Sequence, residues 1–489
     1  MPYRHAVIGF RQGLVAMFLA CMSLGYRDAG QGVSTARAKP PTESAPQPQD
    51  PAHHPPKPLA PDAVTSDWPT FLGPHHDGST PETPLLTRFP PGGPNIVWAA
   101  EIGTGYASPA IVGDRLIVFH RIGDEEIVDC LNGETGRRLW RHAYPTHYHD
   151  RYQFSGGPRS SPTIHDGLVF TYGAEGMLHC LDLDTGEVRW RTNIIEKYKV
   201  AQNFFGVGST PLVWEDVLVV LVGASGGPCV VGLDKQSGAV RWQAGSGWSA
   251  GYASPIPATI HGQDRVLMFT GGDSEPPDGG LLSIDPATGG IDRRVPFRSK
   301  NYTSVNAANP VVVGHQVFLT SSYKTGGALV NLRSDIGYDI AWKNNHLRSQ
   351  FATPIHRDGY LYGFDEINRH NCGLVCVELS TGRQLWRVVP QWKERRMRNN
   401  AQQEQTVTAG RASIISADGH FLLLGEEGQL AWVDLSPQGY KELSKTTLFD
   451  APQTWTPPAI GHGLLYIRQN KIDRSTKAPP RILCYDLRG

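Results

Sequence analysis

Short apolar segments return along the chain at a regular spacing, each introduced by a similar polar step. The plainest copy runs from Ser161 through the apolar segment ending at Phe170, continues over 178–182, and closes with a Thr-Gly turn at 185–186 and Trp190. Apolar runs of about four to eight residues bounded by Gly, Pro and Asp indicate β-strands joined by tight turns. The pattern predicts a repeated unit of short strands over residues 67–489.

The polar step marks the copies of this unit. Its proline recurs at Pro109, Pro162, Pro211, Pro255, Pro310, Pro354 and Pro458, and a copy without proline runs Arg411–Ile414. These eight copies stand roughly 44 to 60 residues apart, which is close to the period of four-stranded propeller blades. We therefore predict an all-β fold, an eight-bladed β-propeller of four-stranded blades.

The second half of the unit joins a glycine turn to a tryptophan four residues later. Glycine accepts the left-handed backbone of such a turn, and the large flat indole in the next strand can fill the wedge between neighbouring blades. Strict copies end at Gly136/Trp140, Gly186/Trp190, Gly238/Trp242 and Gly382/Trp386. The copy at Gly289 carries Arg293 instead, the copy at Gly337/Trp342 is one residue longer, and the copy near Gly439 lacks the signature.

The two ends of the repeat array complement each other. The last copy stops at Gly489, before any tryptophan strand, and a strand of that kind stands at the front as Ile96–Ile102 with Trp98. An N-terminal strand that completes the last blade removes the open sheet edge of a repeat array. The sequence thus predicts a closed ring in which residues 96–102 belong to the last blade.

The N-terminal region has the composition of a targeting segment. Arg4 and Arg11 precede the apolar run 14–20, which is shorter than the ~20 residues that a membrane span needs, so a signal peptide over 1–25 is expected. Phe18–Cys21 resembles a lipoprotein cleavage box with Cys21 as the lipidated residue. Cleavage nearby and an uncleaved anchor remain alternatives. Pro-rich residues 26–66 are expected to be a disordered linker and 67–489 the propeller. These segments predict export to the periplasm or cell envelope, with membrane attachment only through lipidated Cys21 or the signal segment.

Charge and cysteine usage narrow the function classes. Lys plus Arg and Asp plus Glu both number 46, so the chain lacks the basic surplus of nucleic-acid binders. Cys130, Cys180, Cys376 and Cys484 occupy one repeat position, and equivalent positions in different blades lie too far apart for a disulfide. We expect buried thiols there; a disulfide between Cys372 and Cys376 stays open.

A candidate binding site comes from the residue three positions before each polar step. In chain order these are Tyr106, Arg159, Gly208, Tyr252, Ala307, Phe351, Arg411 and Trp455. Because this connection precedes the innermost strand of a blade, the side chains are expected to ring one mouth of the central channel. Its four aromatic residues and two arginines suit a planar or anionic ligand. The alternative is that they pack connecting loops against one another.

Two further segments are rich in polar residues. His147, His149 and Asp150 are weak candidates for a divalent metal site, because alternate residues of an extended segment share a face; a solvated loop is the alternative. Residues 391–398 are expected to form a basic helical insert between blades, with an exposed face without a partner as the simpler interpretation.

The unit Cys180-x-Asp182-x-x-Thr185-Gly186-x-x-x-Trp190 resembles the tryptophan-docking motif of the PQQ-repeat (quinoprotein-type) propellers. That family includes quinoprotein dehydrogenases and a non-catalytic outer-membrane assembly lipoprotein. The segment Asp67–Pro74 also resembles the opening of exported PQQ-repeat-like proteins. The resemblance spans about residues 67–489 and implies the fold. It says little about activity, because the motif fills gaps between blades and touches no substrate.

These observations lead to two main function classes and to a third that has less support. The first is an exported, non-catalytic binding platform or assembly scaffold, whose partners are envelope proteins or a small planar or anionic ligand. The second, implied by the resemblance, is an alcohol or sugar dehydrogenase with PQQ and calcium as cofactors. The chain has no adjacent cysteine pair and no Cys-x-x-Cys-His, and no catalytic residue can be assigned. A polysaccharide-binding lectin would use the same aromatic mouth.

Overall fold

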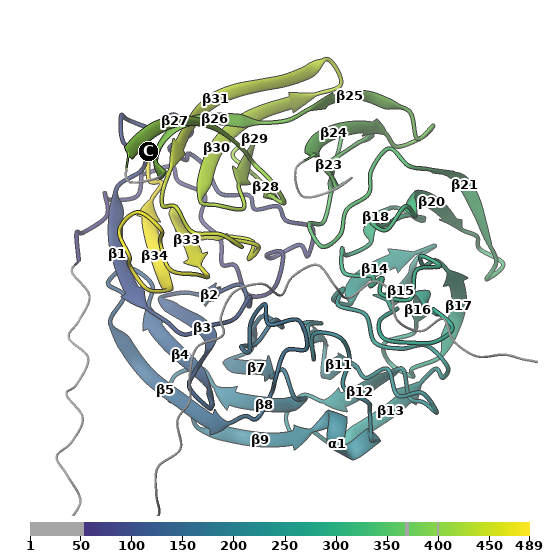
Figure 1. Cartoon of the computed structure of the whole chain (residues 1–489). Coiled ribbons are helices and arrows are strands. Elements are labelled where there is room, and N and C mark those ends of the chain that lie inside the picture. The colour runs from purple at the N-terminus through teal and green to yellow at the C-terminus, as the bar shows by residue number, and fades with distance from the viewer. Residues whose placement is uncertain (1–52, 367–370, 399–400) are drawn as a thin grey trace, which may run out of the picture. The chain divides into compact units, whose positions relative to one another are not determined.

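The computed structural model describes the chain except for residues 1–52, 367–370 and 399–400 (Figure 1). The predicted signal peptide over 1–25, Cys21 and the linker up to residue 52 therefore lie outside the described residues. The rest belongs to one compact unit, Asp50–Gly489, and it is an eight-bladed β-propeller, as predicted. No described helix is long and apolar enough to cross a membrane.

Seven blades take four consecutive strands each, paired antiparallel, and an inserted hairpin separates blade 6 from blade 7. Blade 1 contains β2 (Ala110–Val112), β3 (Arg115–Ile122), β4 (Glu125–Asn132) and β5 (Arg138–Pro145); blade 2 contains β6 (Thr163–His165), β7 (Leu168–Tyr172), β8 (Met177–Asp182) and β9 (Val188–Asn193). Blade 3 contains β10 (Leu212–Trp214), β11 (Val217–Leu221), β12 (Val230–Asp234) and β13 (Val240–Ala244); blade 4 contains β14 (Ile256–Ile260), β15 (Gln263–Phe269), β16 (Gly280–Ile284) and β17 (Ile291–Pro296). Blade 5 contains β18 (Val311–Val313), β19 (Gln316–Ser321), β20 (Gly326–Leu332) and β21 (Tyr338–Asn344); blade 6 contains β22 (Ile355–Arg357), β23 (Tyr360–Glu366), β24 (Cys372–Glu378) and β25 (Gln384–Val388); blade 7 contains β28 (Ser413–Ala417), β29 (His420–Leu424), β30 (Gln429–Ser436) and β31 (Gly439–Thr447).

Blade 8 joins the two ends of the described chain and confirms the predicted closure. It contains β32 (Ala459–Gly461), β33 (Leu464–Gln469), β34 (Arg481–Asp486) and, as its outer strand, β1 (Ile96–Glu101). Trp98 of β1 pairs with Cys484 of β34. In Figure 1 the purple β1 lies beside the yellow β34. The array therefore has no open edge where it starts and ends.

Tryptophans of six blades each bond to the next blade, as the motif predicts. In blade 1 the Trp140 indole N–H donates to the Leu183 carbonyl of blade 2, at 2.8 Å. The same bond is made by Trp190 to Lys235, Trp242 to Pro286, Trp342 to Leu379, Trp386 to Ser436 and Trp98 to Gly133. Arg293, which replaces the tryptophan in blade 4, donates instead to the Arg333 carbonyl at 2.5 Å. A guanidinium can thus substitute for the indole, because the junction requires a donor on a long side chain.

Apolar side chains of neighbouring sheets form the core between the blades. Between blades 1 and 2, for example, Ile117 and Phe119 pack in one buried cluster with Val169 and Leu181. The six cysteines that the structure describes are buried and none of them forms a disulfide, so the buried-thiol prediction holds and the Cys372–Cys376 disulfide is absent from this part of the chain.

The segment before β1, residues 53–95 and hereafter the leader, lies against one end of the ring. Its contacts are with the turns between the first and second strands of blades: Asp67 accepts from Gly113 N–H of blade 1, Asp418 of blade 7 accepts from Leu85 N–H, and Glu82 accepts from Gly463 N–H of blade 8. Trp68 is fully buried and bonds β2 through Ile111. Residues 53–66, which composition assigned to the linker, also contact the ring, through a bridge between His53 and Trp98 of β1.

The insert at 391–398 is a strand, so the expectation of a helix was wrong. β26 (Gln391–Arg398) pairs with β27 (Ala401–Thr408) as a two-stranded hairpin between blades 6 and 7. Trp392 is buried, whereas Gln391, Lys393 and Arg395 are exposed. This alternation has the period of two that belongs to a strand. The helix described by the structure, α1 (Ile194–Tyr198), lies instead between blades 2 and 3.

Between blades 1 and 2 a buried histidine predicts a measurable pH dependence. The His179 ring lies 4.9 Å from the His142 ring and 4.4 Å from the Tyr144 ring, measured between centroids. Neither His179 nitrogen has a hydrogen-bond partner, and burial lowers the pKa of His179 from 6.5 to about 3. The unfolded chain therefore binds this proton near pH 6.5 while the folded chain does not, so stability is lost as pH falls below 6.5.

We expect the wild-type chain to lose about 2 kcal/mol from this group between pH 7.5 and 5. His179→Leu should abolish that part of the slope in urea unfolding measured at both pH values. The exposed His147→Leu is the control, and its slope should match that of the wild type. Equal slopes in all three proteins would contradict a neutral buried His179.

Candidate functional site

The end of the ring opposite the leader is formed by the connections that enter each innermost strand. The leader contacts the turns that follow those strands, so the other mouth of the channel lies at their beginnings. The positions predicted to ring this mouth come from these connections.

The structure brings the six predicted mouth residues into one contact network. The Trp455 ring centroid lies 5.5 Å from that of Tyr106 and 5.6 Å from that of Phe351. The Arg411 guanidinium is 5.9 Å from the Trp455 centroid, and the Arg159 guanidinium is 5.8 Å from the Tyr106 centroid. Side chains of blades far apart in sequence therefore meet. Such contacts are expected both for a shared binding site and for the alternative that these residues pack the connecting loops against one another, so ligand binding stays a proposal.

Further aromatic residues extend this network beyond what the repeat predicted. Phe205 stands 5.6 Å from Tyr252 and 5.8 Å from the Arg159 guanidinium, and so connects Tyr252 to the rest. Phe154 contacts Phe205 at 6.1 Å and Trp455 at 5.7 Å. The mouth cluster, as we define it, contains Tyr106, Phe154, Arg159, Phe205, Tyr252, Phe351, Arg411 and Trp455. Phe154 and Phe205 lie in long connections outside the repeat unit, where only their local aromatic density marked them.

Asp150, the weak metal candidate, instead organises the loop below Arg159. Its carboxylate accepts from the N–H groups of Phe154 and Ser155 and from the Arg159 guanidinium at 2.8 Å. His147 and His149 contribute backbone groups here: His147 N–H donates to Glu175, and the His149 carbonyl accepts from Gln202. Among the described residues there is no group of three or more His, Cys, Asp or Glu that could hold a metal.

The second mouth arginine is paired with a buried carboxylate. Arg411 Nε lies 3.2 Å from Glu366 Oε2, and its backbone N–H donates to Glu426. Burial raises the pKa of Glu366 to about 7, partly offset by its hydrogen bond from Gln350 and by the charge of Arg411. Near neutral pH this carboxyl therefore neutralises Arg411 only in part.

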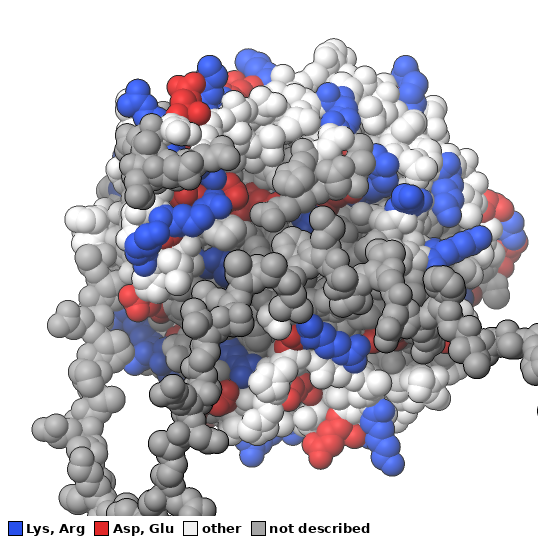
Figure 2. Space-filling view, viewed as in Figure 1, with Lys and Arg blue, Asp and Glu red and all other residues white. Residues whose placement is uncertain are grey.

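Two additional cations lie at the mouth. Arg468 is fully buried beside Tyr106, and its guanidinium donates to the carbonyls of Phe119 and Gly103. Lys471 Nζ donates to the Phe154 carbonyl at 2.6 Å, and burial lowers the pKa of Lys471. Both cations bond carbonyl oxygens, so they add positive charge beside Tyr106 and Phe154. On the face drawn in Figure 2, by contrast, described cationic and anionic side chains are interspersed.

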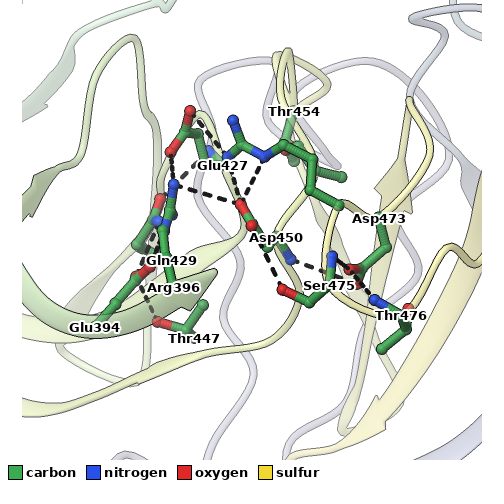
Figure 3. Close-up of polar contacts among 12 residues, drawn as sticks. Glu394, Arg396, Glu427, Gln429, Thr447, Asp450, Thr454, Asp473, Ser475 and Thr476 are labelled. Atoms are coloured by element: carbon green, nitrogen blue, oxygen red, sulfur yellow. Dashed lines mark hydrogen bonds and ion pairs between the residues drawn. The ribbon is translucent and has the colours of Figure 1, made fainter. Parts of the chain in front are cut away.

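A charged network beside the mouth fastens the β26–β27 hairpin to blades 7 and 8 (Figure 3). Arg396 of the hairpin pairs with Glu427 at 2.5 Å, with Glu394 at 2.7 Å and with Asp450 at 3.4 Å. Arg474, from the β33–β34 connection, pairs with Glu427 at 3.1 Å and also contacts Asp450. The hairpin base is therefore held rigidly next to the segment that carries Trp455.

The mouth does not fit PQQ with calcium. Its carboxylates Asp150 and Glu366 are bound to arginines and backbone N–H groups rather than gathered around one point. The Tyr106 and Trp455 rings contact each other at 33°, so they do not face each other across a flat slot. At the mouth cluster, therefore, the described side chains provide neither a calcium ligand set nor a parallel stacking site for PQQ.

Comparison with known proteins identifies a family. The family model described as outer membrane protein assembly factor BamB, of the PQQ-repeat type, matches residues 124–388, more than half of the chain. No curated protein sequence is similar enough to count as a match.

Solved structures share the architecture at low sequence identity. The crystal structure of BamB from Moraxella catarrhalis covers 80% of this chain and 97% of its own, with 17% identity and a TM-score of 0.52. Quinohemoprotein alcohol dehydrogenase from Comamonas testosteroni covers 86% and 81%, with 11% identity and a TM-score of 0.59. A europium-containing methanol dehydrogenase covers 86% and 98%, with 11% identity and a TM-score of 0.58. At these identities the likeness establishes the fold alone.

Proposed function

Because the chain belongs to the PQQ-repeat family described as outer membrane protein assembly factor BamB, we propose that it is an exported, non-catalytic propeller that binds a protein partner in the cell envelope at the mouth cluster. The observation that carries this proposal is the single network of aromatic rings and arginines at the end of the ring opposite the leader. Interfaces concentrate their binding energy in aromatic and arginine side chains of this kind.

The chemistry of the cluster favours a partner segment that presents acidic and planar side chains. Arg159 and Arg411 offer guanidinium groups that are already oriented by Asp150 and Glu366. Fixed donors lose little conformational freedom on binding. The leader contacts the opposite end of the ring, so it would not compete with a partner at the mouth cluster.

The test is capture of partners from an envelope extract with the full chain. Trp455 contacts Tyr106, Phe154 and Phe351, so Trp455→Ala should weaken capture of the main partner about tenfold, as expected for a central aromatic anchor. Trp248→Ala is the matched control, because Trp248 is also half-buried and lies outside the mouth cluster. Equal capture by both variants, or no partner recovered with the wild type, would refute the proposed site.

Export and lipidation at Cys21 belong to the same proposal. We propose a signal peptide over residues 1–25, a tether over 26–52, and attachment of the propeller to a membrane through lipidated Cys21. Cys21→Ser should release the chain from the membrane fraction and remove metabolic labelling by a fatty acid. Retention of the Cys21→Ser protein in that fraction would favour the uncleaved signal segment as the anchor.

The absence of catalysis is tested separately. The full chain incubated with PQQ and calcium should reduce no artificial electron acceptor when alcohols or aldoses are supplied. Turnover that depends on added PQQ would exclude the non-catalytic function and establish a dehydrogenase.

A further inference from the structure

A buried carboxyl group lies directly behind one of the two mouth arginines. Glu366 is the last residue of β23, and its side chain is 2% exposed. Its Oε2 lies 3.2 Å from Arg411 Nε, but neither of these atoms takes part in a hydrogen bond. Its Oε1 accepts from the Gln350 N–H at 3.0 Å. The ion pair is therefore in contact but lacks the aligned donors that a buried carboxylate needs to offset its lost hydration.

The titratable side chains that face Glu366 come from the strands and turns packed around it. Among the described residues they are Tyr323, Asp365, Cys372, Arg411 and Glu426. Burial raises the pKa of the Tyr323 hydroxyl and raises the pKa of the Cys372 thiol to about 12, so neither is charged near neutral pH. Asp365 is bound by Arg348 at 2.7 Å. Arg411 is therefore the cation that pairs directly with Glu366.

Glu366 changes its charge within the neutral pH range. Burial raises the pKa of this carboxyl to about 7, while its hydrogen bond from the Gln350 N–H and the charge of Arg411 act in the opposite direction. The Arg411 guanidinium stays charged throughout this range. The net charge of the pair therefore rises as pH falls.

The other end of the Arg411 side chain belongs to the mouth cluster. Its guanidinium lies 5.9 Å from the Trp455 ring centroid, and the side chain is 28% exposed. The contact with Glu366 involves Nε, and no hydrogen bond to another described residue engages Nη1 or Nη2. A guanidinium with two free terminal nitrogens can bind a carboxylate through two parallel hydrogen bonds.

We propose that Arg411 and Trp455 bind a carboxylate group and that this binding tightens when Glu366 is protonated. The source of the carboxylate, an acidic side chain of the partner, rests on the proposed function. When Glu366 is ionised, it shares one guanidinium with the bound carboxylate and the two repel each other. When Glu366 is neutral, the whole charge of Arg411 acts on the ligand. Binding therefore takes up a proton, and affinity rises as pH falls from 8 to 6.

Benzoate is the probe for this site, because it joins a carboxylate to a planar ring and stays ionised between pH 6 and 8. Calorimetric titration of the full chain should give saturable binding that is about three- to tenfold weaker at pH 8 than at pH 6. In Glu366→Gln the side chain is neutral at both pH values and can still accept from the Gln350 N–H, so benzoate should bind equally tightly at both. Benzamide has no charge and should show no difference between the two pH values.

The matched control is Glu427→Gln. Glu427 also pairs with arginines beside the mouth, Arg396 and Arg474. Burial acts to raise its pKa, but the hydrogen bond and charge of Arg396 outweigh burial and lower it, so Glu427 stays ionised in this range. Its substitution should leave the pH dependence of benzoate binding as in the wild type. No saturable binding of benzoate, or the same pH dependence in wild type and Glu366→Gln, would overturn the inference.

Capture of the partner at the two pH values separates this inference from the proposed function. If the wild type captures more partner at pH 6 than at pH 8 and Glu366→Gln captures it equally at both, the inference holds for the partner. If the wild type captures the partner equally at both pH values, the proposed function stands and control by Glu366 fails. If benzoate shows the expected pH dependence while no partner is recovered, the carboxylate site stands and the proposed function fails.

Discussion

Replacing Trp98 by alanine should lower the free energy of unfolding by about 3 to 5 kcal/mol, the usual cost of deleting a buried large aromatic side chain. The indole is fully buried, and its N–H donates to the Gly133 carbonyl of blade 1 at 2.8 Å. It therefore packs on the strand that closes the ring and also bonds the first blade. Urea unfolding at neutral pH measures the change.

Trp190→Ala is the matched comparison for Trp98→Ala. Trp190 makes the same bond, to Lys235, at 3.0 Å, but it is only half-buried and the blades it links are consecutive in the chain. We expect a loss smaller by about 1 to 2 kcal/mol, in proportion to the apolar area removed from water.

Hydrogen exchange shows which blade each substitution loosens, in addition to the difference in free energy of unfolding. In Trp98→Ala the amides of β34 should exchange faster, because β34 pairs with β1; in Trp190→Ala they should be unchanged. If the two variants unfold at the same urea concentration and β34 stays protected in both, ring closure does not depend on the Trp98 indole.

Most of the ring could be predicted because its information is local. The turn glycine, the tryptophan four residues on and the polar step all lie within one repeat, and together they define strand order, blade number and closure. Arg293 shows where this reasoning stops. The sequence shows that arginine replaces the tryptophan there, and only the structure shows how its guanidinium bonds the Arg333 carbonyl across the same junction.

The mouth cluster likewise contains residues that the repeat predicts and residues that it does not. Tyr106, Phe351 and Trp455 follow from the repeat, because equivalent positions of a ring face a common centre. Phe154 and Phe205 do not, since they stand in connections of unequal length whose path is decided by tertiary contacts such as the Asp150 carboxylate. The hairpin at 391–408 was misjudged for a related reason. Its arginines suggested an exposed helix, whereas Arg396 points to carboxylates contributed by blades 7 and 8.

The leader was the least predictable part, because its contacts span almost the whole chain. Glu82 and His462 are 380 residues apart, yet the Glu82 carboxylate accepts from the His462 N–H at 2.5 Å. The same carboxylate accepts from Ser66 N–H at 3.0 Å and from Gly463 N–H at 2.8 Å. No spacing or composition in residues 53–95 points to such a partner, and the side chain is 1% exposed.

Glu82→Ala should therefore cost about 3 to 4 kcal/mol, because it leaves three backbone N–H groups without an acceptor in a buried setting. Glu82→Gln should cost about 1 to 2 kcal/mol: one amide oxygen can replace Oε1, which serves Ser66 and His462, while the amide nitrogen cannot accept from Gly463. Exposed Glu101→Ala is the control and should change stability by less than about 0.5 kcal/mol. Urea unfolding of the wild type and the three variants measures these changes in the free energy of unfolding.

The position of the leader gives this prediction a second readout. Freed from the β32–β33 turn of blade 8, the leader should be cut by a protease within residues 60–90 faster in Glu82→Ala than in wild type, while the blades stay intact. Equal cleavage rates in Glu82→Ala and Glu101→Ala would show that other contacts, such as the Trp68–Ile111 bridge, are sufficient to hold the leader.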